Sequence, residues 1–110
     1  MKLKWYLKQK WQKLTRGYSD EELWNLDSTI CKWILPRLKS FKKQTIGYPH
    51  DFNDIEEWKE TIQKMIDAFE IYSTEDLPDY AFSPSSIEED GKRVKEGFEL
   101  FSKYFRNLWW

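Results

Sequence analysis

Three motifs of the form Ser/Asn-x-x-Glu divide the sequence, and each stands directly before apolar residues at helical spacing. They begin at Ser19, Asn53 and Ser86, and Glu22, Glu56 and Glu89 follow three residues later. In such a capping box, the first side chain accepts from the backbone of the third helical residue, whose Glu side chain reaches back. The motifs therefore predict three helix starts, and they restrict the fold to a helical class more firmly than composition does.

Four apolar stripes predict four amphipathic helices. The stripes are Leu3, Leu7, Trp11 and Leu14 within residues 2–15; Leu23, Leu26, Ile30, Ile34, Leu38 and Phe41 after Ser19; Ile55, Trp58, Ile62, Met65 or Ile66, Phe69 and Tyr72 after Asn53; and Ile87, Val94, Phe98, Phe101, Phe105 and Leu108 after Ser86. Residues 44–53 and 73–85 carry Gly and Pro and are expected to be loops. We expect an all-α fold, a small bundle of about four helices in a single domain over residues 1–110.

Two residues interrupt these helical patterns. Pro36 lies inside the second stripe and lacks the N–H that would bond the carbonyl of Lys32. We therefore expect the second helix to be kinked near residues 32–36 or broken into two shorter helices. Gly97 lies in the middle of the fourth helix, where its missing side chain would let a neighbouring helix or a bulky Trp come close.

Composition narrows the class of protein. No apolar run approaches the roughly 20 residues that a membrane-spanning helix needs, and the basic start of the chain lacks the apolar region of a secretory signal. A single cysteine, Cys31, cannot form an internal disulfide, which favours a reducing, cytoplasmic setting. We expect no metal and no cofactor, because neither a Gly-rich phosphate loop nor a metal-ligand spacing is present.

Charge is distributed unevenly along the chain. Residues 1–43 carry a net charge of +7 and residues 44–110 a net charge of −8, so the whole chain is close to neutral at −1. The basic first helix also carries Trp5, Tyr6 and Trp11. Our first interpretation is that this helix covers the core with its leucines and keeps its lysines in water. The alternatives are that the helix binds nucleic acid or a nucleotide-like anion, a partner protein, or a membrane surface. Among these alternatives we place nucleic acid or a nucleotide-like anion first, a partner protein second and a membrane surface last. The pI near 5.9 nevertheless lacks the basic excess that is usual in a nucleic-acid binder.

The tryptophans suggest an interface. Trp109 and Trp110 are adjacent, so they cannot both face one helical groove, and Trp24 and Trp33 lie beside the second stripe rather than on it. Because Trp is enriched at interface hot spots, we expect a homo-oligomer.

Residues with catalytic chemistry form no recognisable constellation. His50 is the only histidine and stands beside Asp51 in a loop, which favours a surface role over base catalysis. Cys31 lies mid-helix, whereas an activated thiol is typical of a helix N-terminus, so we expect a buried core residue. The sequence therefore favours a protein that is not an enzyme.

Parts of the chain resemble a group of small proteins encoded by tailed bacteriophages and prophages. The resemblance covers most of the chain outside the first helix and residues 73–90. It is carried by Arg16-Gly17-Tyr18-Ser19-Asp20, Trp24, Asp27, Ile34-Leu35-Pro36-Arg37-Leu38, Gly47-Tyr48-Pro49, Trp58, Met65-Ile66, Phe69 and Phe101 to Trp109. The group carries no assigned chemistry, so the resemblance implies only a context, a phage gene product acting in the cytoplasm of a host bacterium.

The leading hypothesis is a phage-encoded, non-enzymatic binding protein, and specifically a counter-defence protein that sequesters a nucleotide-derived immune signal. Aromatic stacking and pairing of phosphate with Arg or Lys would supply the contacts. The candidate ligand-binding residues are Trp24, Lys32, Arg37, Tyr48, Lys103, Tyr104 and Arg106. The alternatives are an inhibitor that binds a host enzyme through an aromatic patch, and a virion or DNA-handling accessory protein.

Overall fold

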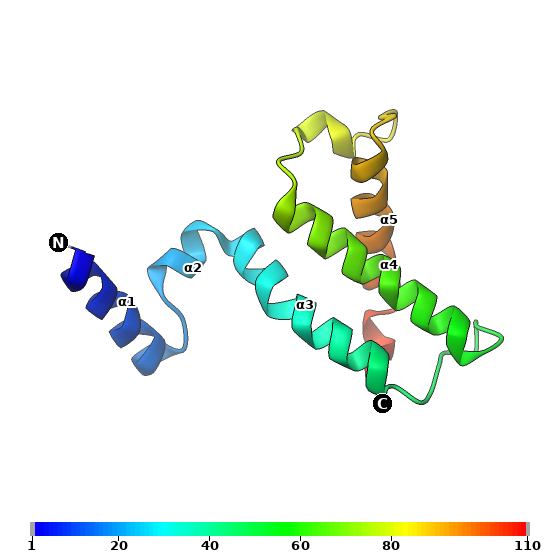
Figure 1. Cartoon of the computed structure of the whole chain (residues 1–110), viewed down its shortest axis with the longest axis horizontal. Coiled ribbons are helices and arrows are strands. Elements are labelled where there is room, and N and C mark those ends of the chain that lie inside the picture. Colours follow the sequence, from blue (N-terminus) through cyan, green and yellow to red (C-terminus); the bar gives the residue numbers. More distant parts are fainter. Residues whose placement is uncertain (1, 110) are drawn as a thin grey trace. The chain divides into compact units, whose positions relative to one another are not determined.

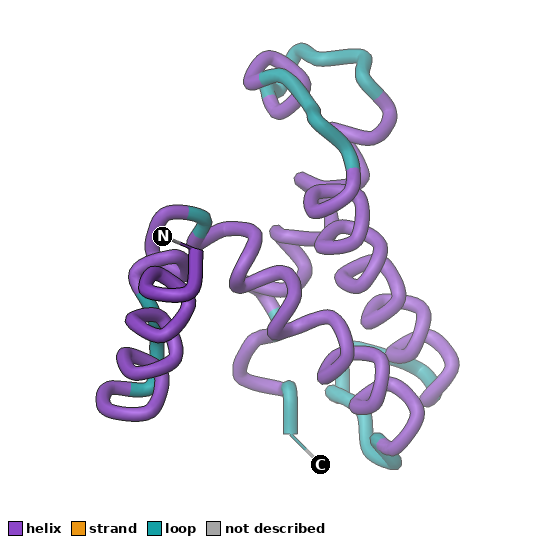
Figure 2. The backbone as a smooth tube through the Cα atoms, turned by 60° about the vertical axis from the view of Figure 1, so that its left-hand side comes forward, coloured by secondary structure: helices purple, strands orange, loops and turns teal. Residues whose placement is uncertain are grey.

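A computed structural model describes residues 2–109, and the described chain consists of helices joined by loops, with no strand (Figures 1 and 2). The elements are α1 (Lys2–Arg16), α2 (Asp20–Trp24), α3 (Leu26–Gln44), α4 (Ile55–Thr74), the 3₁₀ turn η1 (Asp79–Phe82), α5 (Glu89–Lys103) and the 3₁₀ turn η2 (Phe105–Asn107). The predicted all-α fold is confirmed.

The chain divides into two compact units between Ile30 and Cys31, a point that lies within α3. Unit 1 contains α1, α2 and the first residues of α3, and unit 2 contains the remainder. The expectation of a single domain over residues 1–110 stays a prediction, and each unit is described by itself below.

The helical stretch after Ser19 is interrupted at Asn25 and not at Pro36. Asn25 leaves helical geometry, with φ −126° and ψ 53°, and separates α2 from α3. By contrast, α3 continues through Pro36 as one helix. Pro36 and Lys32, whose carbonyl would otherwise accept from residue 36, are both exposed, and the loss of one bond on the solvent side of a helix costs less than in a buried interior.

Of the three predicted helix starts, one is correct and two are displaced. At Ser19 the capping box is present, and the Glu22 carboxylate accepts from the Ser19 N–H at 2.6 Å. The cap of α4 is Asp54 rather than Asn53, and its Oδ1 accepts from the N–H of Glu57 at 2.9 Å.

The predicted cap at Ser86 is also wrong, because α5 begins at Glu89 with Glu88 as its N-cap. The Ser86 hydroxyl accepts from the N–H of Glu88 at 3.0 Å, so this serine closes a local turn instead of a helix. The fourth helix is also shorter than predicted, since α5 ends at Lys103 and η2 follows.

The core of unit 2 lies around α4. Its buried face packs against Cys31 and Leu38 of α3 and against Tyr104, which follows α5. The buried residues of α4 are Trp58, Ile62, Met65, Ile66, Ala68 and Phe69. The buried position predicted for Cys31 is confirmed, at 2% exposure. Lys42 Nζ donates to Gln63 Oε1 at 2.8 Å and adds a polar link between α3 and α4.

Gly97 sets the distance between α4 and α5, which pack directly against each other (Figure 1). A Cβ at this position would lie 2.5 Å from the carbonyl oxygen of Lys64 and closer still to the Cβ of Ala68. The close approach of a neighbouring helix that the sequence predicts at Gly97 is therefore confirmed.

Unit 1 by itself does not bury the first apolar stripe, which was expected to cover the core. Leu3, Leu7, Trp11 and Leu14 are all more than half exposed, and the buried residue of α1 is Gln9. The physical reason is that α1 contacts α2 through glutamine side chains on its other side, which leaves the leucines outward.

Gly97→Ala should destabilise the protein although Ala is the better helix former. The added methyl group would collide with the backbone of α4, and overpacking of this kind costs about 2 kcal/mol. Urea denaturation followed by circular dichroism measures the change. Gly47→Ala is the matched control, since a Cβ there meets nothing within 4 Å, and equal stability of both variants would contradict the contact.

Candidate functional site

Two glutamine side chains of α1 hold the start of α2. Gln9 Oε1 accepts from the backbone N–H of Glu21 at 3.0 Å, and Gln12 Oε1 accepts from that of Asp20 at 2.8 Å. These N–H groups belong to the first turn of α2 and have no partner within the helix. The glutamines therefore accept from backbone N–H groups of α2 that have no partner in that helix, and these hydrogen bonds fix how α1 lies on α2.

Asp20 completes this interface with its carboxylate. Gln12 Nε2 donates to Oδ2 at 2.8 Å, and the Arg16 guanidinium donates to Oδ1 at 2.7 Å. The hydrogen bond from Gln12, followed by that from Arg16, lowers the pKa of Asp20 below its ordinary value.

A cleft of about 500 Å³ opens beside this interface in unit 1. It is lined by Trp5, Tyr6, Gln9, Lys10, Lys13, Leu14, Ser19 and Glu21. The aromatic rings of Trp5 and Tyr6 are about half exposed. The cleft thus combines two accessible aromatic rings, two ammonium groups and one carboxylate.

Lys10 stays charged at the edge of this cleft. Its Nζ lies 5.1 Å from the centroid of the Tyr6 ring. Its interaction with Tyr6, by hydrogen bonding first and by charge second, raises the pKa of Lys10 above its ordinary value. Lys13 Nζ lies 3.9 Å from Glu22 Oε1, so its charge is partly matched within unit 1.

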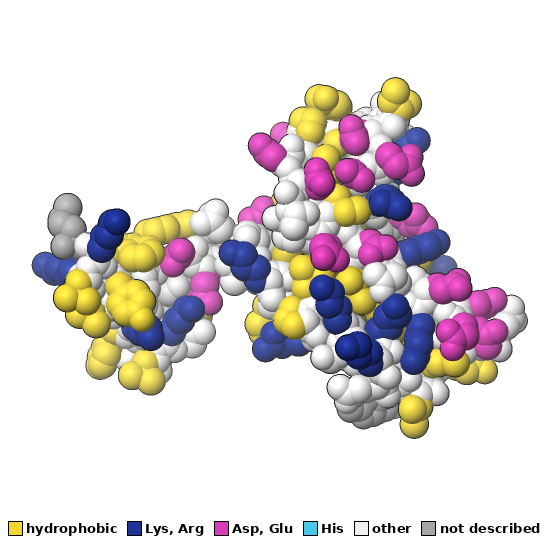
Figure 3. Space-filling view, in the orientation of Figure 1, with side chains coloured by type: hydrophobic (Ala, Val, Ile, Leu, Met, Phe, Trp, Pro, Cys, Tyr) yellow, Lys and Arg dark blue, Asp and Glu magenta, His cyan; other side chains and the backbone are white. Residues whose placement is uncertain are grey.

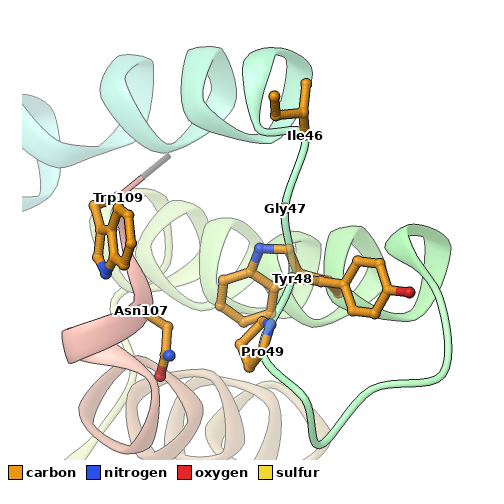
Figure 4. A pocket seen from close by; sticks show the side chains of 7 residues that line it. Ile46, Gly47, Tyr48, Pro49, Asn107 and Trp109 are labelled. Carbon is orange, nitrogen blue, oxygen red and sulfur yellow. The ribbon is translucent and has the colours of Figure 1, made fainter.

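A second cavity, of about 230 Å³, lies in unit 2 between the loop after α3 and the C-terminal segment. It is lined by Ile46, Gly47, Tyr48, Pro49, Trp58, Asn107 and Trp109. Figure 4 shows Trp109 and Asn107 on one side of it and Tyr48 with Pro49 on the other. No Lys or Arg is among these lining residues, so the cavity suits an uncharged ring better than an anion.

The seven residues predicted from sequence are divided between the two units. Trp24 is 65% exposed at the end of α2 in unit 1, whereas the other six belong to unit 2. Tyr48 lines the unit 2 cavity. Tyr104 is 8% exposed and its ring packs on Phe52 and Trp58 at centroid distances of 5.2 and 5.6 Å, so no ligand could stack on it.

The four basic candidates each lie at the surface. The Arg37 guanidinium stacks on Trp33, 4.1 Å from the ring centroid, and donates to the Trp33 carbonyl at 2.7 Å. Lys103 Nζ lies 5.2 Å from the Tyr104 centroid. Lys32 on α3 and Arg106 in η2 are exposed and line neither cavity.

The sequence did not predict that the cleft residues form a site, although it showed the mixture of aromatic and basic residues in α1. Trp5, Tyr6 and the lysines of α1 were recognised as an aromatic and basic mixture. The sequence could not show that Ser19 and Glu21 close one side of a cleft against them.

The remaining reactive residues form no site among the residues described. His50 is exposed, as predicted, with Nε2 3.4 Å from Asp51 Oδ1. Within residues 2–109, no three His, Cys, Asp or Glu side chains are grouped so that they could hold a metal ion. The helices described here include none that is long and apolar enough to cross a membrane.

Comparison with protein-family models, with curated proteins and with solved structures finds no match for the chain. The chemistry of the two cavities therefore carries the functional argument.

Gln12→Ala should raise the pKa of Asp20 toward its ordinary value, because Gln12 makes the largest contribution to lowering it. A carboxyl whose pKa is lower in the folded chain stabilises the fold above its ordinary pKa, and this contribution is lost as the pH falls through the folded value. Titration of the Asp20 carboxyl carbon by NMR measures the shift. Gln63→Ala, in unit 2, is the control, and an unchanged pKa in Gln12→Ala would contradict the assigned cause.

Proposed function

We propose that the protein is a non-enzymatic binding protein that sequesters a planar, anionic ligand of the nucleotide class. The observation that carries the proposal is the unit 1 cleft, in which Trp5 and Tyr6 lie beside Lys10 and Lys13. The two parts of a nucleotide need these two kinds of side chain, an aromatic face for the base and a cation for the phosphate.

The aromatic side chains supply the base contact. Trp5 is 42% and Tyr6 49% exposed, so each ring has accessible surface. Stacking of a base on an aromatic side chain contributes about 1–3 kcal/mol and depends little on the identity of the base. The Glu21 carboxylate, which also lines the cleft, would accept hydrogen bonds from a base amino group or a ribose hydroxyl.

The lysines supply the phosphate contact. Lys10 is the stronger candidate, since no acidic side chain lies within ion-pair distance of it among the described residues. Lys13 already faces Glu22 at 3.9 Å, and phosphate would compete with that carboxylate. A lysine ammonium binds phosphate as a compact point charge without fixed geometry.

The resemblance to phage proteins supplies the biological setting of the proposal. In an infected bacterium, capture of a nucleotide-derived immune signal would act as counter-defence by lowering the free concentration of that signal. Binding alone is enough for this effect, so the proposal needs no catalytic group.

A second candidate, an inhibitor that binds a host enzyme, is supported by the exposed tryptophans. Trp24, Trp33 and Trp109 are 65%, 57% and 74% exposed, and Trp is typical of interface hot spots. The same exposure supports the proposed homo-oligomer, while Trp110 lies outside the described residues.

Cyclic di-AMP and ATP should bind the full chain more tightly than adenosine, and Lys10→Ala should weaken both phosphate-containing probes about tenfold. The reason is that one charge-assisted contact to phosphate contributes about 1.5–3 kcal/mol. Isothermal titration calorimetry measures these affinities. Lys4→Ala is the matched control, because Lys4 lies on the same helix but does not line the cleft.

Two results would contradict the proposal. Absence of binding for all three probes would overturn the nucleotide class. A loss in Tyr48→Ala with no loss in Lys10→Ala would place the ligand in the unit 2 cavity, which is lined by Tyr48 and not by Lys10.

A further inference from the structure

One face of α1 is apolar and is left uncovered by the rest of unit 1. We call it the leucine face, and it consists of Leu3, Leu7, Trp11 and Leu14, which are 69%, 55%, 65% and 80% exposed. Four large apolar side chains so exposed along one short helix form a contiguous stripe, which is typical of an interaction surface rather than of scattered surface residues.

The leucine face points away from α2 because of helix geometry. Successive residues of an α-helix are rotated by about 100°, which places Leu3, Leu7 and Leu14 within roughly 40° of one another. The same rotation places Gln9 and Gln12, which bind the start of α2, on roughly the opposite side. The contact with α2 therefore leaves the leucine face free within unit 1.

The charge on α1 is entirely positive. The helix carries Lys2, Lys4, Lys8, Lys10, Lys13 and Arg16 and no acidic residue. Lys8 and Arg16 face Asp20 at 3.8 and 2.7 Å, and Lys13 faces Glu22 at 3.9 Å. No ion pair with a described residue involves the other three lysines. Figure 3 shows apolar and basic side chains mingled over α1.

The lysines without acidic partners border the leucine face. By the rotation of about 100° per residue, Lys10 lies close to one edge of the face, beside Leu3, and Lys4 lies close to the other, beside Trp11. Lys and Trp are the residues that occupy the headgroup level when an apolar helix face enters a lipid surface.

We infer that α1 binds the surface of an anionic lipid membrane, with the leucine face in the boundary between headgroups and acyl chains. A helix of 15 residues is about 22 Å long and would lie flat in that boundary, with Lys4 and Lys10 reaching the lipid phosphates. The inference shares Lys10 and Leu14 with the proposed ligand site in the cleft, whereas Leu3, Leu7 and Trp11 do not line the cleft.

Charge and shape favour lipid over the other occupants. A second copy of α1 would bring one set of unmatched lysines against another, and like charges in contact repel. Nucleic acid would match the lysines but offers no apolar layer in which the leucines could be buried. An anionic membrane satisfies both the leucines and the lysines.

The experiment is co-sedimentation of the full chain with vesicles of phosphatidylcholine alone and of phosphatidylcholine mixed with phosphatidylglycerol. The protein should sediment with the anionic vesicles and much less with the neutral ones, and added salt should weaken the binding by screening the lysines. Leu3→Asn combined with Leu7→Asn should lower the partition at least about tenfold, since buried leucines contribute most of the apolar term.

Leu23→Asn is the matched control, because Leu23 is 52% exposed but lies on α2. Circular dichroism checks that the variants keep their helices. Leu3 and Leu7 do not line the cleft, so the affinity for cyclic di-AMP should be unchanged in the double variant. This separates failure of the membrane inference from failure of the proposed function.

Three outcomes would overturn the inference. The first is absence of binding to anionic vesicles, and the second is equal binding by the double variant and the wild type. The third is a dimer in size-exclusion chromatography that Leu3→Asn with Leu7→Asn dissociates, because the leucine face would then be an interface between copies.

Discussion

The exposure of the leucine face depends on the hydrogen bonds that Gln9 and Gln12 make with the first turn of α2. A helix N-terminus leaves backbone N–H groups without partners, and here side chains from a neighbouring helix supply the acceptors. Because both acceptors are on one side of α1, that side of the helix contacts α2. The opposite side, which carries the leucines, and the flank that forms the cleft are then left to other contacts.

Unit 2 depends on a different constraint, the apolar packing around α4. Trp58 packs against Phe52, and the two ring centroids lie 5.3 Å apart. Tyr104 closes the same cluster, and its hydroxyl lies 3.5 Å from Asp51 Oδ2. These contacts draw the loop before α4 and the segment after α5 together, and the small cavity of Figure 4 lies between the two segments.

The sequence predicts the helical class and the burial of α4 well, because its apolar stripe has a partner on each side in unit 2. It predicts helix ends less well. Ser86 matches the capping motif, yet its hydroxyl bonds the backbone two residues later, and a local turn of this kind competes with helix capping on nearly equal terms. Pro36 likewise shows why helix ends are hard to predict. The cost of the backbone hydrogen bond that proline cannot donate depends on whether the carbonyl left without a partner reaches solvent.

The candidate site was harder to predict, because its position depends on which side of α1 contacts α2. Periodicity identifies an apolar face and a polar face but does not say which one touches the neighbouring helix. In most proteins the apolar face does so, and this default placed the leucines inside. In α1 the polar face makes the contact, since the side-chain oxygens of the buried Gln9 and the partly buried Gln12 accept from N–H donors that would otherwise be unsatisfied.

Unit 1 has a polar interior, and this composition suggests why ligand binding would be concentrated there. Among residues 2–30, the buried side chains are Gln9 and Ser19, and both are polar. The apolar burial that stabilises most folds is therefore nearly absent there, although the apolar residues themselves are present at the surface. Any ligand or lipid surface that covers them would stabilise the α1–α2 arrangement in proportion to its affinity for the folded unit. The free energy that unit 2 gains from its own core is available to unit 1 only through contacts made outside unit 1.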